Sequence, residues 1–145
     1  MNEYNKEIRD KDFVENLIPQ KAPFVMVDKL LHFEDQKIIA GLKVSPENIF
    51  TENNEFTAPG LIEHMAQSVA LHTGYRYFLK DEDPPVGYLG AIKKIEIFRL
   101  PEIENELVTT VDILHDIMGV TLVKVETRKG NQLLASGEMK TVLAS

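Results

Sequence analysis

A single long helical pattern, in a chain that otherwise alternates like β-strand, most constrains the fold of this protein. From Leu61 to Leu79 the apolar residues recur at intervals of three and four, as Ile62, Met65, Ala66 and Val69 do. Apolar side chains occupy much of the helix girth, as they do in a helix that is covered on several sides. We therefore expect one long, buried helix wrapped by a sheet.

Strand patterns lie on both sides of this helix. Before it, the run from Phe24 to Glu34 and the run KIIAGLKV, residues 37–44, are separated by Asp35 and Gln36, which predicts a hairpin. Residues 45–60 are rich in Pro, Asn, Glu and Thr, which favour turns, and we interpret them as an ordered loop. Four β-rich runs follow the helix: Tyr88 to Arg99, Glu106 to Asp116, Val120 to Thr127 and Gln132 to Leu143.

Together these elements predict an α+β fold, in which an antiparallel sheet of about six strands packs on a long central helix. A short helix is expected near the N-terminus. The chain has 145 residues, of which 43% are hydrophobic, and this is enough for one core. We predict a single domain over residues 1–145. Because the edge strands of such a sheet are open to pairing, we also expect a homodimer or a higher homo-oligomer.

Charge and composition exclude several classes of function. The 23 acidic residues outnumber the 16 basic ones, for a net charge of −7, and no run of Lys and Arg is present, so we expect no nucleic-acid partner. No apolar run approaches the roughly 18 residues of a membrane span, and the first ten residues lack the apolar centre of a signal peptide. Without cysteine there is no disulfide framework and no thiolate. We expect a cytoplasmic protein that does not contact a membrane.

Glu63 is the candidate catalytic residue, because it lies among apolar neighbours in the first turn of the predicted helix, directly after a Pro-Gly pair and two apolar residues. An acidic residue there can simply complement the helix dipole, which contributes roughly 0.3 to 1 kcal/mol. Gln67 follows one turn later on the same face, where its amide can hold a carboxylate or a water beside it.

The four histidines do not have the spacing of a metal site. His64 is adjacent to Glu63 in sequence but points about 100° around the helix, and His72 does not stand at the i, i+4 spacing of helical metal pairs. His32 and His115 are isolated in predicted strands. No HExxH, GxSxG or GxGxxG motif occurs, so we expect neither a metal nor a cofactor.

Two motifs carry a resemblance to a known family. The first is LIPQKAPFVMVDKLL, residues 17–31, and the second is LIEHMAQ, residues 61–67, at the start of the helix. Together they resemble the 3-hydroxyacyl-[acyl carrier protein] dehydratase family of the hotdog fold, over nearly the whole chain. The positions that match the family pattern are Pro19, Pro23, Phe24, Val27 and Asp28 in the first motif and Glu63, Met65, Ala66 and Gln67 in the second.

The resemblance implies a hotdog fold whose sheet wraps the central helix, and a dimer whose sheets join edge to edge. It implies an active site at the dimer interface, where a histidine of one subunit faces the helix carboxylate of the other in an apolar tunnel. The histidine removes the α-proton of a 3-hydroxyacyl thioester, and the acid protonates the departing hydroxyl. Glu63 then is the acid, and the acyl thioester of a carrier protein or of coenzyme A is expected to contact Gln67, Gly60, Pro23 and Phe24.

Gln20 stands at the position of the family's histidine, so the chain departs from the pattern at a catalytic position. Glutamine donates and accepts hydrogen bonds but does not take up a proton near neutral pH, so the base is missing. The glycine-rich segment GHFPG, which precedes the helix in the family, is also absent.

Several hypotheses are consistent with a chain that has Glu63 at the position of the family's acid and no histidine at the position of its base. The chain is a dehydratase of fatty-acid or polyketide-type biosynthesis that uses another base or is weakly active, or it is an acyl thioesterase in which Glu63 activates water. Alternatively it is a non-catalytic or half-catalytic subunit that completes a site in a heterodimer with a histidine-containing homologue, or a scaffold that only binds acyl groups. Candidates for contact with an acidic carrier protein are Lys21, Lys93, Lys94 and Arg99.

Overall fold

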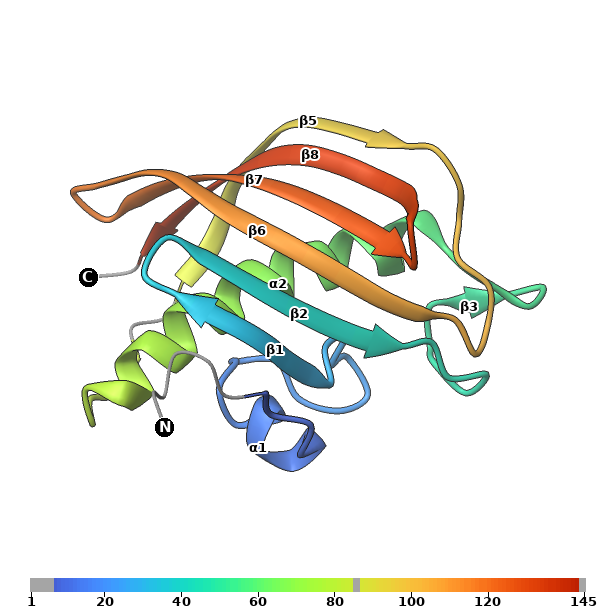
Figure 1. Ribbon diagram of the computed structural model, residues 1–145, viewed down its shortest axis with the longest axis horizontal. Coiled ribbons are helices and arrows are strands. Elements are labelled where there is room, and N and C mark those ends of the chain that lie inside the picture. Colours follow the sequence, from blue (N-terminus) through green and yellow to red (C-terminus); the bar gives the residue numbers. More distant parts are fainter. Residues whose placement is uncertain (1–6, 85–86, 144–145) are drawn as a thin grey trace.

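The computed structural model describes residues 7–84 and 87–143, and it shows one long helix, α2, held in the curve of an antiparallel sheet (Figure 1). These are the two layers that the sequence predicts. The elements in chain order are α1 (Lys11–Glu15), β1 (Lys29–Glu34), β2 (Lys37–Lys43), β3 (Thr51–Glu52), β4 (Glu55–Phe56), α2 (Ala58–Leu79), β5 (Gly87–Ile97), β6 (Glu106–Ile117), β7 (Val120–Lys129) and β8 (Gln132–Leu143).

Helix α2 forms the centre of the core because it buries side chains on most of its surface. It begins at Ala58, directly before Pro59, whose fixed φ suits the first turn of a helix. Gly74 allows the closest packing, since a Cβ there would lie 1.9 Å from the carbonyl oxygen of Leu17. The buried apolar residues of the helix include Leu61, Met65, Val69, Leu71 and Tyr75.

The sheet has the order β1-β2-β6-β7-β8-β5, and every neighbouring pair is antiparallel. Two-residue turns join its three hairpins, at Asp35 and Gln36 between β1 and β2, at Met118 and Gly119 between β6 and β7, and at Gly130 and Asn131 between β7 and β8. Met118 and Gly119 have φ values of 54° and 80°, which match the twist of the flanking strands. Such short turns fix the register, so that one face of the sheet stays toward α2.

The first strand starts later than the sequence predicts. β1 begins at Lys29, whereas the apolar pattern predicts a strand from Phe24 onward. The peptide groups of Phe24 and Met26 are hydrogen-bonded to the side chain of Gln67 on α2 and not to a neighbouring strand. Met26 and Val27 are 1% and 0% exposed, so the pattern correctly predicts burial, but the burial is against the helix.

The segment that the sequence predicts as an ordered loop, residues 45–60, contains a hairpin of two short strands, β3 and β4. Asn53 and Asn54 form its turn with φ values of 53° and 66°, a conformation that asparagine adopts more readily than most residues. Phe56 at the end of β4 is fully buried. The hairpin therefore anchors the chain immediately before α2.

The two edges of the sheet differ in how they are covered. At β1, Ile8 and Leu30 exchange backbone hydrogen bonds of 2.7 and 2.9 Å, so the N-terminal segment protects part of this edge. At the other edge, β5 pairs only with β8 within the described residues. Ile92 in β5 and Phe98 just after it are 44% and 56% exposed. This open edge with apolar residues is suited to pairing with a second chain.

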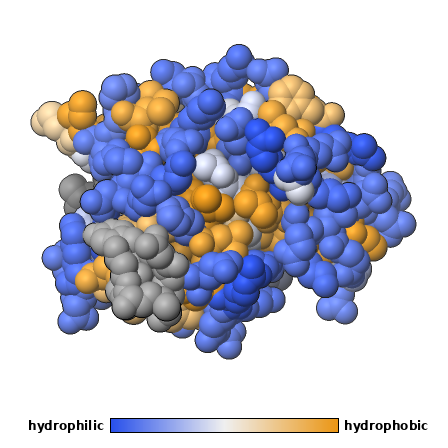
Figure 2. All heavy atoms as spheres, viewed as in Figure 1, coloured by the Kyte–Doolittle hydropathy of each residue, from blue (hydrophilic) through white to orange (hydrophobic). Residues whose placement is uncertain are grey.

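Hydrophilic side chains cover most of the face that Figures 1 and 2 share, and apolar atoms show in its middle and at the turn between β6 and β7 (Figure 2). At this turn Ile117 and Met118 are 63% and 96% exposed. Two exposed apolar residues at a hairpin tip are a small surface compared with a protein interaction site, so we assign no function to the tip.

Candidate active site

Glu63 is the centre of the candidate site, and it lies farther from the start of the helix than the sequence predicts. Because α2 begins at Ala58, Glu63 lies in the second turn and not, as the sequence predicts, in the first, where there is no acidic residue. The helix dipole acts mainly within the first turn, so complementing it explains Glu63 poorly. The side chain is half-buried, and its Oε2 accepts a hydrogen bond of 2.7 Å from Nε2 of Gln67. This confirms the contact that the i, i+4 spacing predicts.

Gln67 is fully buried, and every polar group of its amide is used within the protein. Its Oε1 accepts the backbone N–H of Met26 at 2.6 Å, and its Nε2 donates to the carbonyl of Phe24 at 2.8 Å as well as to Glu63. The amide has only this orientation, because reversing it would set its NH₂ against an N–H and its oxygen against two acceptors. Gln67 therefore links the first motif to the second and orients the Glu63 carboxylate.

Gln20 lies half-buried in the segment between α1 and β1. Its Oε1 is buried and has no hydrogen-bond partner among the described residues, a condition that is uncommon for a buried polar atom. The neighbouring Lys21 donates from Nζ to the carbonyls of Glu15 and Ile18, at 2.9 and 2.8 Å. Its ammonium is thus engaged at the end of α1 and is a weaker candidate for contact with a carrier protein.

The other predicted substrate contacts lie in different surroundings. Pro23 and Phe24 are exposed, Phe24 by 55%, and its carbonyl is joined to Gln67 as described. Gly60 is buried, and a Cβ there would lie 2.5 Å from Cβ of Phe50, so close packing of the loop explains this glycine. The structure thus brings Phe24, Gln67 and Glu63 together, while Gly60 packs against the segment that precedes the helix.

His64 does not share the surroundings of Glu63, as the helix geometry predicts. Its ring is fully buried, with Nδ1 2.7 Å from the carbonyl oxygen of Met26 and Nε2 2.7 Å from Oγ1 of Thr109 on β6. Burial lowers the pKa of His64 to about 4, so the ring is neutral near pH 7. No local pattern could predict these contacts, because Met26 and Thr109 lie 38 and 45 residues from His64 in the sequence.

His72 lies nine residues after Glu63, about 13 Å farther along the helix axis. Its Nε2 donates to the carbonyl of Glu34 at 2.9 Å, and its ring stacks on Phe33. Burial lowers the pKa of His72 as well. A histidine so placed cannot reach a substrate at Glu63.

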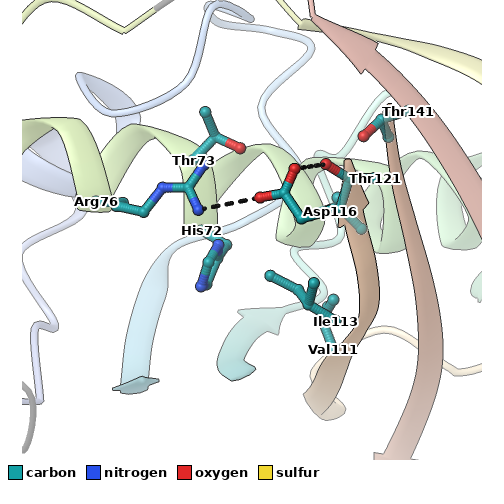
Figure 3. A pocket seen from close by; sticks show the side chains of 9 residues that line it. His72, Thr73, Arg76, Val111, Ile113, Asp116, Thr121 and Thr141 are labelled. Carbon is teal, nitrogen blue, oxygen red and sulfur yellow. Dashed lines mark hydrogen bonds and ion pairs between the residues drawn. The ribbon is translucent and has the colours of Figure 1, made fainter. Parts of the chain in front are cut away.

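Next to His72, a small hollow opens between α2 and the sheet (Figure 3). Its rim carries an ion pair between Arg76 and Asp116, with N···O 3.4 Å, and Thr121 donates to Asp116 at 3.2 Å. The hollow has a volume of about 10 Å³, room for about one water molecule. It is too small for an acyl chain, so Glu63 remains the candidate site.

Within residues 7–84 and 87–143, no group of three or more His, Cys, Asp or Glu side chains is placed to hold a metal ion. In the same part of the chain, neither helix has the length and hydropathy needed to cross a bilayer.

The sequence of this chain from residue 13 to residue 144 matches the model of the ApeP-like dehydratase family, described as ApeP dehydratase. The chain belongs to this family. The match includes both motifs and thus confirms the resemblance to dehydratases that these motifs carry.

Relatives of this family member include 3-hydroxyacyl-[acyl-carrier-protein] dehydratases named FabZ. The protein from Variovorax paradoxus is 30% identical over 123 residues, which cover 81% of this chain and 82% of the relative. The protein from Aliivibrio fischeri is 26% identical over 138 residues, which cover 88% of each.

Solved structures confirm the hotdog fold. A chain of the dehydratase heterocomplex ApeI:P from Xenorhabdus doucetiae has a TM-score of 0.85 at 17% identity, over 91% of both chains. A hypothetical thioesterase with coenzyme A from Streptococcus pneumoniae has a TM-score of 0.64 at 9% identity, over 80% of this chain and 84% of that one. At these identities the likeness concerns the fold alone, and the family match shows that this hotdog protein is dehydratase-like.

Proposed function

We propose that this chain supplies Glu63 as the acid of a 3-hydroxyacyl-thioester dehydratase site, and that a homologous partner chain supplies the histidine base. The observation that carries the proposal is the oriented Glu63 carboxylate, hydrogen-bonded at 2.7 Å by a fully buried Gln67. At the position where the family pattern has its base, the chain has Gln20, which cannot take up a proton.

In this scheme the partner's histidine removes the proton from the carbon next to the thioester carbonyl. The electron pair forms the new carbon–carbon double bond as the hydroxyl group leaves from the next carbon. Glu63, in its protonated form, gives its proton to the departing hydroxyl, and water is released. The histidine then holds one extra proton and Glu63 lacks one, so a single proton transfer between them restores the site.

The two histidines of α2 give little support to the hypothesis of another base. Both ring nitrogens of His64 are hydrogen-bonded in the core, and His72 is bonded to Glu34 at a more distant part of the helix. A base from a second chain fits the open edge at β5, where a partner's sheet can continue this one. The similar structure from Xenorhabdus doucetiae is a dehydratase heterocomplex, which also supports a heteromeric assembly.

The substrate that we propose is a 3-hydroxyacyl group on a carrier protein, since the FabZ relatives are named for such substrates. Lys93, Lys94 and Arg99 are exposed on and just after β5, beside the edge that the partner would join. They offer positive charge to an acidic carrier in a chain whose net charge is −7.

The test is formation of the enoyl product from 3-hydroxyacyl-carrier substrates by three preparations: the chain alone, the chain with Gln20→His, and the complex purified from the native host. We expect the chain alone to be inactive, because its homodimer has no base. The native complex and the Gln20→His homodimer should both turn over. Turnover by the unaltered homodimer, or purification of homodimers only, would contradict the proposal.

Glu63→Gln in the native complex is the decisive variant, since the amide keeps the shape of the side chain and removes its proton. Loss of one carboxylic acid of this kind costs about 100-fold to 10,000-fold in rate. Glu47→Gln, at an exposed acidic position, is the matched control and should retain the rate. Release of free thiol from the same substrates, lost in Glu63→Gln, would favour the thioesterase hypothesis in place of the dehydratase.

A further inference from the structure

A buried row of hydrogen bonds crosses the molecule from the first motif, past α2, to the sheet. It consists of the Met26 carbonyl, both ring nitrogens of His64, and the hydroxyl groups of Thr109 and Thr127, with each of the three distances 2.7 Å. Thr109 on β6 and Thr127 on β7 are paired residues of neighbouring strands. His64, Thr109 and Thr127 are each 0% exposed, so their side chains do not hydrogen-bond to bulk solvent.

The chemistry of these groups sets the direction of every proton in the row. A carbonyl only accepts, so Nδ1 of His64 must carry the hydrogen that bonds Met26. In the neutral ring Nε2 then holds a lone pair, and Thr109 must donate to it. The oxygen of Thr109 is left free to accept from Thr127. The Met26 carbonyl thus fixes the tautomer of His64, and Thr109, bonded to Thr127, helps to hold the ring in one orientation.

Met26 is the residue that the row holds in place. Its carbonyl accepts from His64, its N–H donates to Gln67 at 2.6 Å, and Nδ2 of Asn48 lies 3.2 Å from its sulfur. His64 and Gln67 are three residues apart on α2, on neighbouring turns. Gln67 bonds the N–H of Met26 and His64 bonds its C=O. In a sheet, a neighbouring strand makes these two backbone bonds.

The same contacts continue from Met26 to the candidate acid. Gln67 can keep its amide oxygen on the Met26 N–H only while the backbone of Met26 stays in place, and its amide nitrogen then points at Glu63. We propose that His64 is a positioning residue for Glu63, acting through the backbone of Met26, whose C=O it holds and whose N–H bonds the Gln67 amide. The catalytic part of this inference rests on the proposed function, whereas the chain of contacts does not.

The first test needs no activity. In the full chain, we would measure hydrogen exchange of the Met26 amide, with the Leu30 amide, which donates to Ile8 at 2.9 Å, as the internal reference. His64→Ala should speed exchange of the Met26 amide about tenfold relative to Leu30, because the backbone of Met26 loses one of its two anchors, the one on its carbonyl. An unchanged ratio of the Met26 and Leu30 exchange rates would overturn the proposal. This includes the case in which both amides are accelerated equally, because equal acceleration reports only a loss of global stability.

Two variants separate loss of the hydrogen bonds of His64 from loss of its ring volume. His64→Asn places an amide nitrogen near the former Nδ1, where it can donate to Met26, and should restore most of the slow exchange. If His64→Ala does not fold, Thr109→Val serves instead, because it keeps the ring and removes the donor to Nε2. Thr109→Val should also raise the exchange rate of the Met26 amide relative to Leu30. An unchanged rate would overturn the proposal. His115→Ala, at an exposed histidine, is the matched control.

The tautomer gives a second signature. The ¹⁵N shifts of the His64 ring near pH 7 should report hydrogen on Nδ1 and a lone pair on Nε2. The opposite tautomer would overturn the proposal, because it could not donate to the Met26 carbonyl.

The kinetic test uses the native complex. His64→Ala should lower kcat with little change in KM, and His64→Asn should recover most of the rate, since the acid is misoriented while the substrate still binds. A higher KM at unchanged kcat would overturn the positioning role. If Glu63→Gln has no effect in the same complex, the proposed function fails and the catalytic part of this inference with it, while exchange at Met26 still decides the contacts.

Discussion

Acid should destabilise this protein through His64 more than its exposed histidines would suggest. Burial lowers the pKa of His64 to about 4 in the folded chain, against 6.5 for the ordinary side chain. Between these two values the unfolded chain binds a proton that the folded chain does not. The stability that His64 contributes is therefore complete above about pH 6.5 and is lost as the pH falls toward 4.

The size of the effect follows from the two pKa values. The linkage relation gives a loss of about 2 kcal/mol in the free energy of unfolding at pH 5 and about 3 kcal/mol at pH 4. This is a large part of the roughly 5 to 15 kcal/mol that stabilises a domain. His72 acts with the same sign, because burial lowers its pKa too.

Urea unfolding at a fixed protein concentration, followed by circular dichroism from pH 8 to pH 5, measures the effect. Carboxylates also titrate toward the acid end, so the informative quantity is the difference between wild type and His64→Asn. This difference should shrink by about 2 kcal/mol between pH 8 and pH 5, since asparagine does not titrate. His115→Asn, which removes an exposed histidine, should lose as much free energy of unfolding between pH 8 and pH 5 as the wild type does. A difference that does not vary with pH would refute the reasoning.

Three further predictions concern packing, association and charge. Gly74→Ala should lower the free energy of unfolding by at least about 1 to 3 kcal/mol, measured by urea unfolding, because its Cβ would meet the Leu17 carbonyl at 1.9 Å. Ile92→Glu should weaken association at the β5 edge, measured by light scattering after gel filtration, since a charge would be buried in the interface. Reversing Lys93 and Arg99 to Glu should weaken binding of an acidic carrier protein at low salt, measured by calorimetry.

Each of these predictions has a control on the same molecule. Ala70→Gly, one turn before Gly74, should show only the ordinary helix penalty of about 1 kcal/mol. Ile117→Glu changes an exposed residue at the β6–β7 turn and should leave association intact. Lys124→Glu reverses an exposed charge on β7 and should leave carrier binding nearly unchanged. If a control changes the measured quantity as much as its test variant, the assigned site is wrong.

Local spacing was enough to predict the layers of this fold. The periods of three to four residues and of two residues identified the long helix and the six strands of the sheet. Spacing failed where a contact between distant residues changed the local structure. Phe24 to Met26 have the apolar pattern of a strand, yet side chains of α2 bind their peptides, and no pattern within the segment could show this.

The candidate site divides in the same way. The contact between Glu63 and Gln67 followed from positions four residues apart on a helix, so the sequence predicted it. The contact between Gln67 and Met26 joins residues 41 positions apart, and the one between His64 and Thr109 joins residues 45 positions apart. Such contacts depend on how the first motif folds across the helix, and a single sequence does not encode that placement in any local period.

These contacts also bear on the proposal that this dehydratase-like chain supplies an acid but no base. Gln67 bonds Glu63 and the N–H of Met26, His64 bonds the C=O of Met26, and neither side chain is bonded to Gln20. The buried Oε1 of Gln20 has no partner among the described residues, so replacing this side chain breaks no hydrogen bond of that oxygen. A change at position 20 can thus remove or restore the base without disturbing the orientation of the acid. This independence is the reason to expect that Gln20→His alone yields an active homodimer.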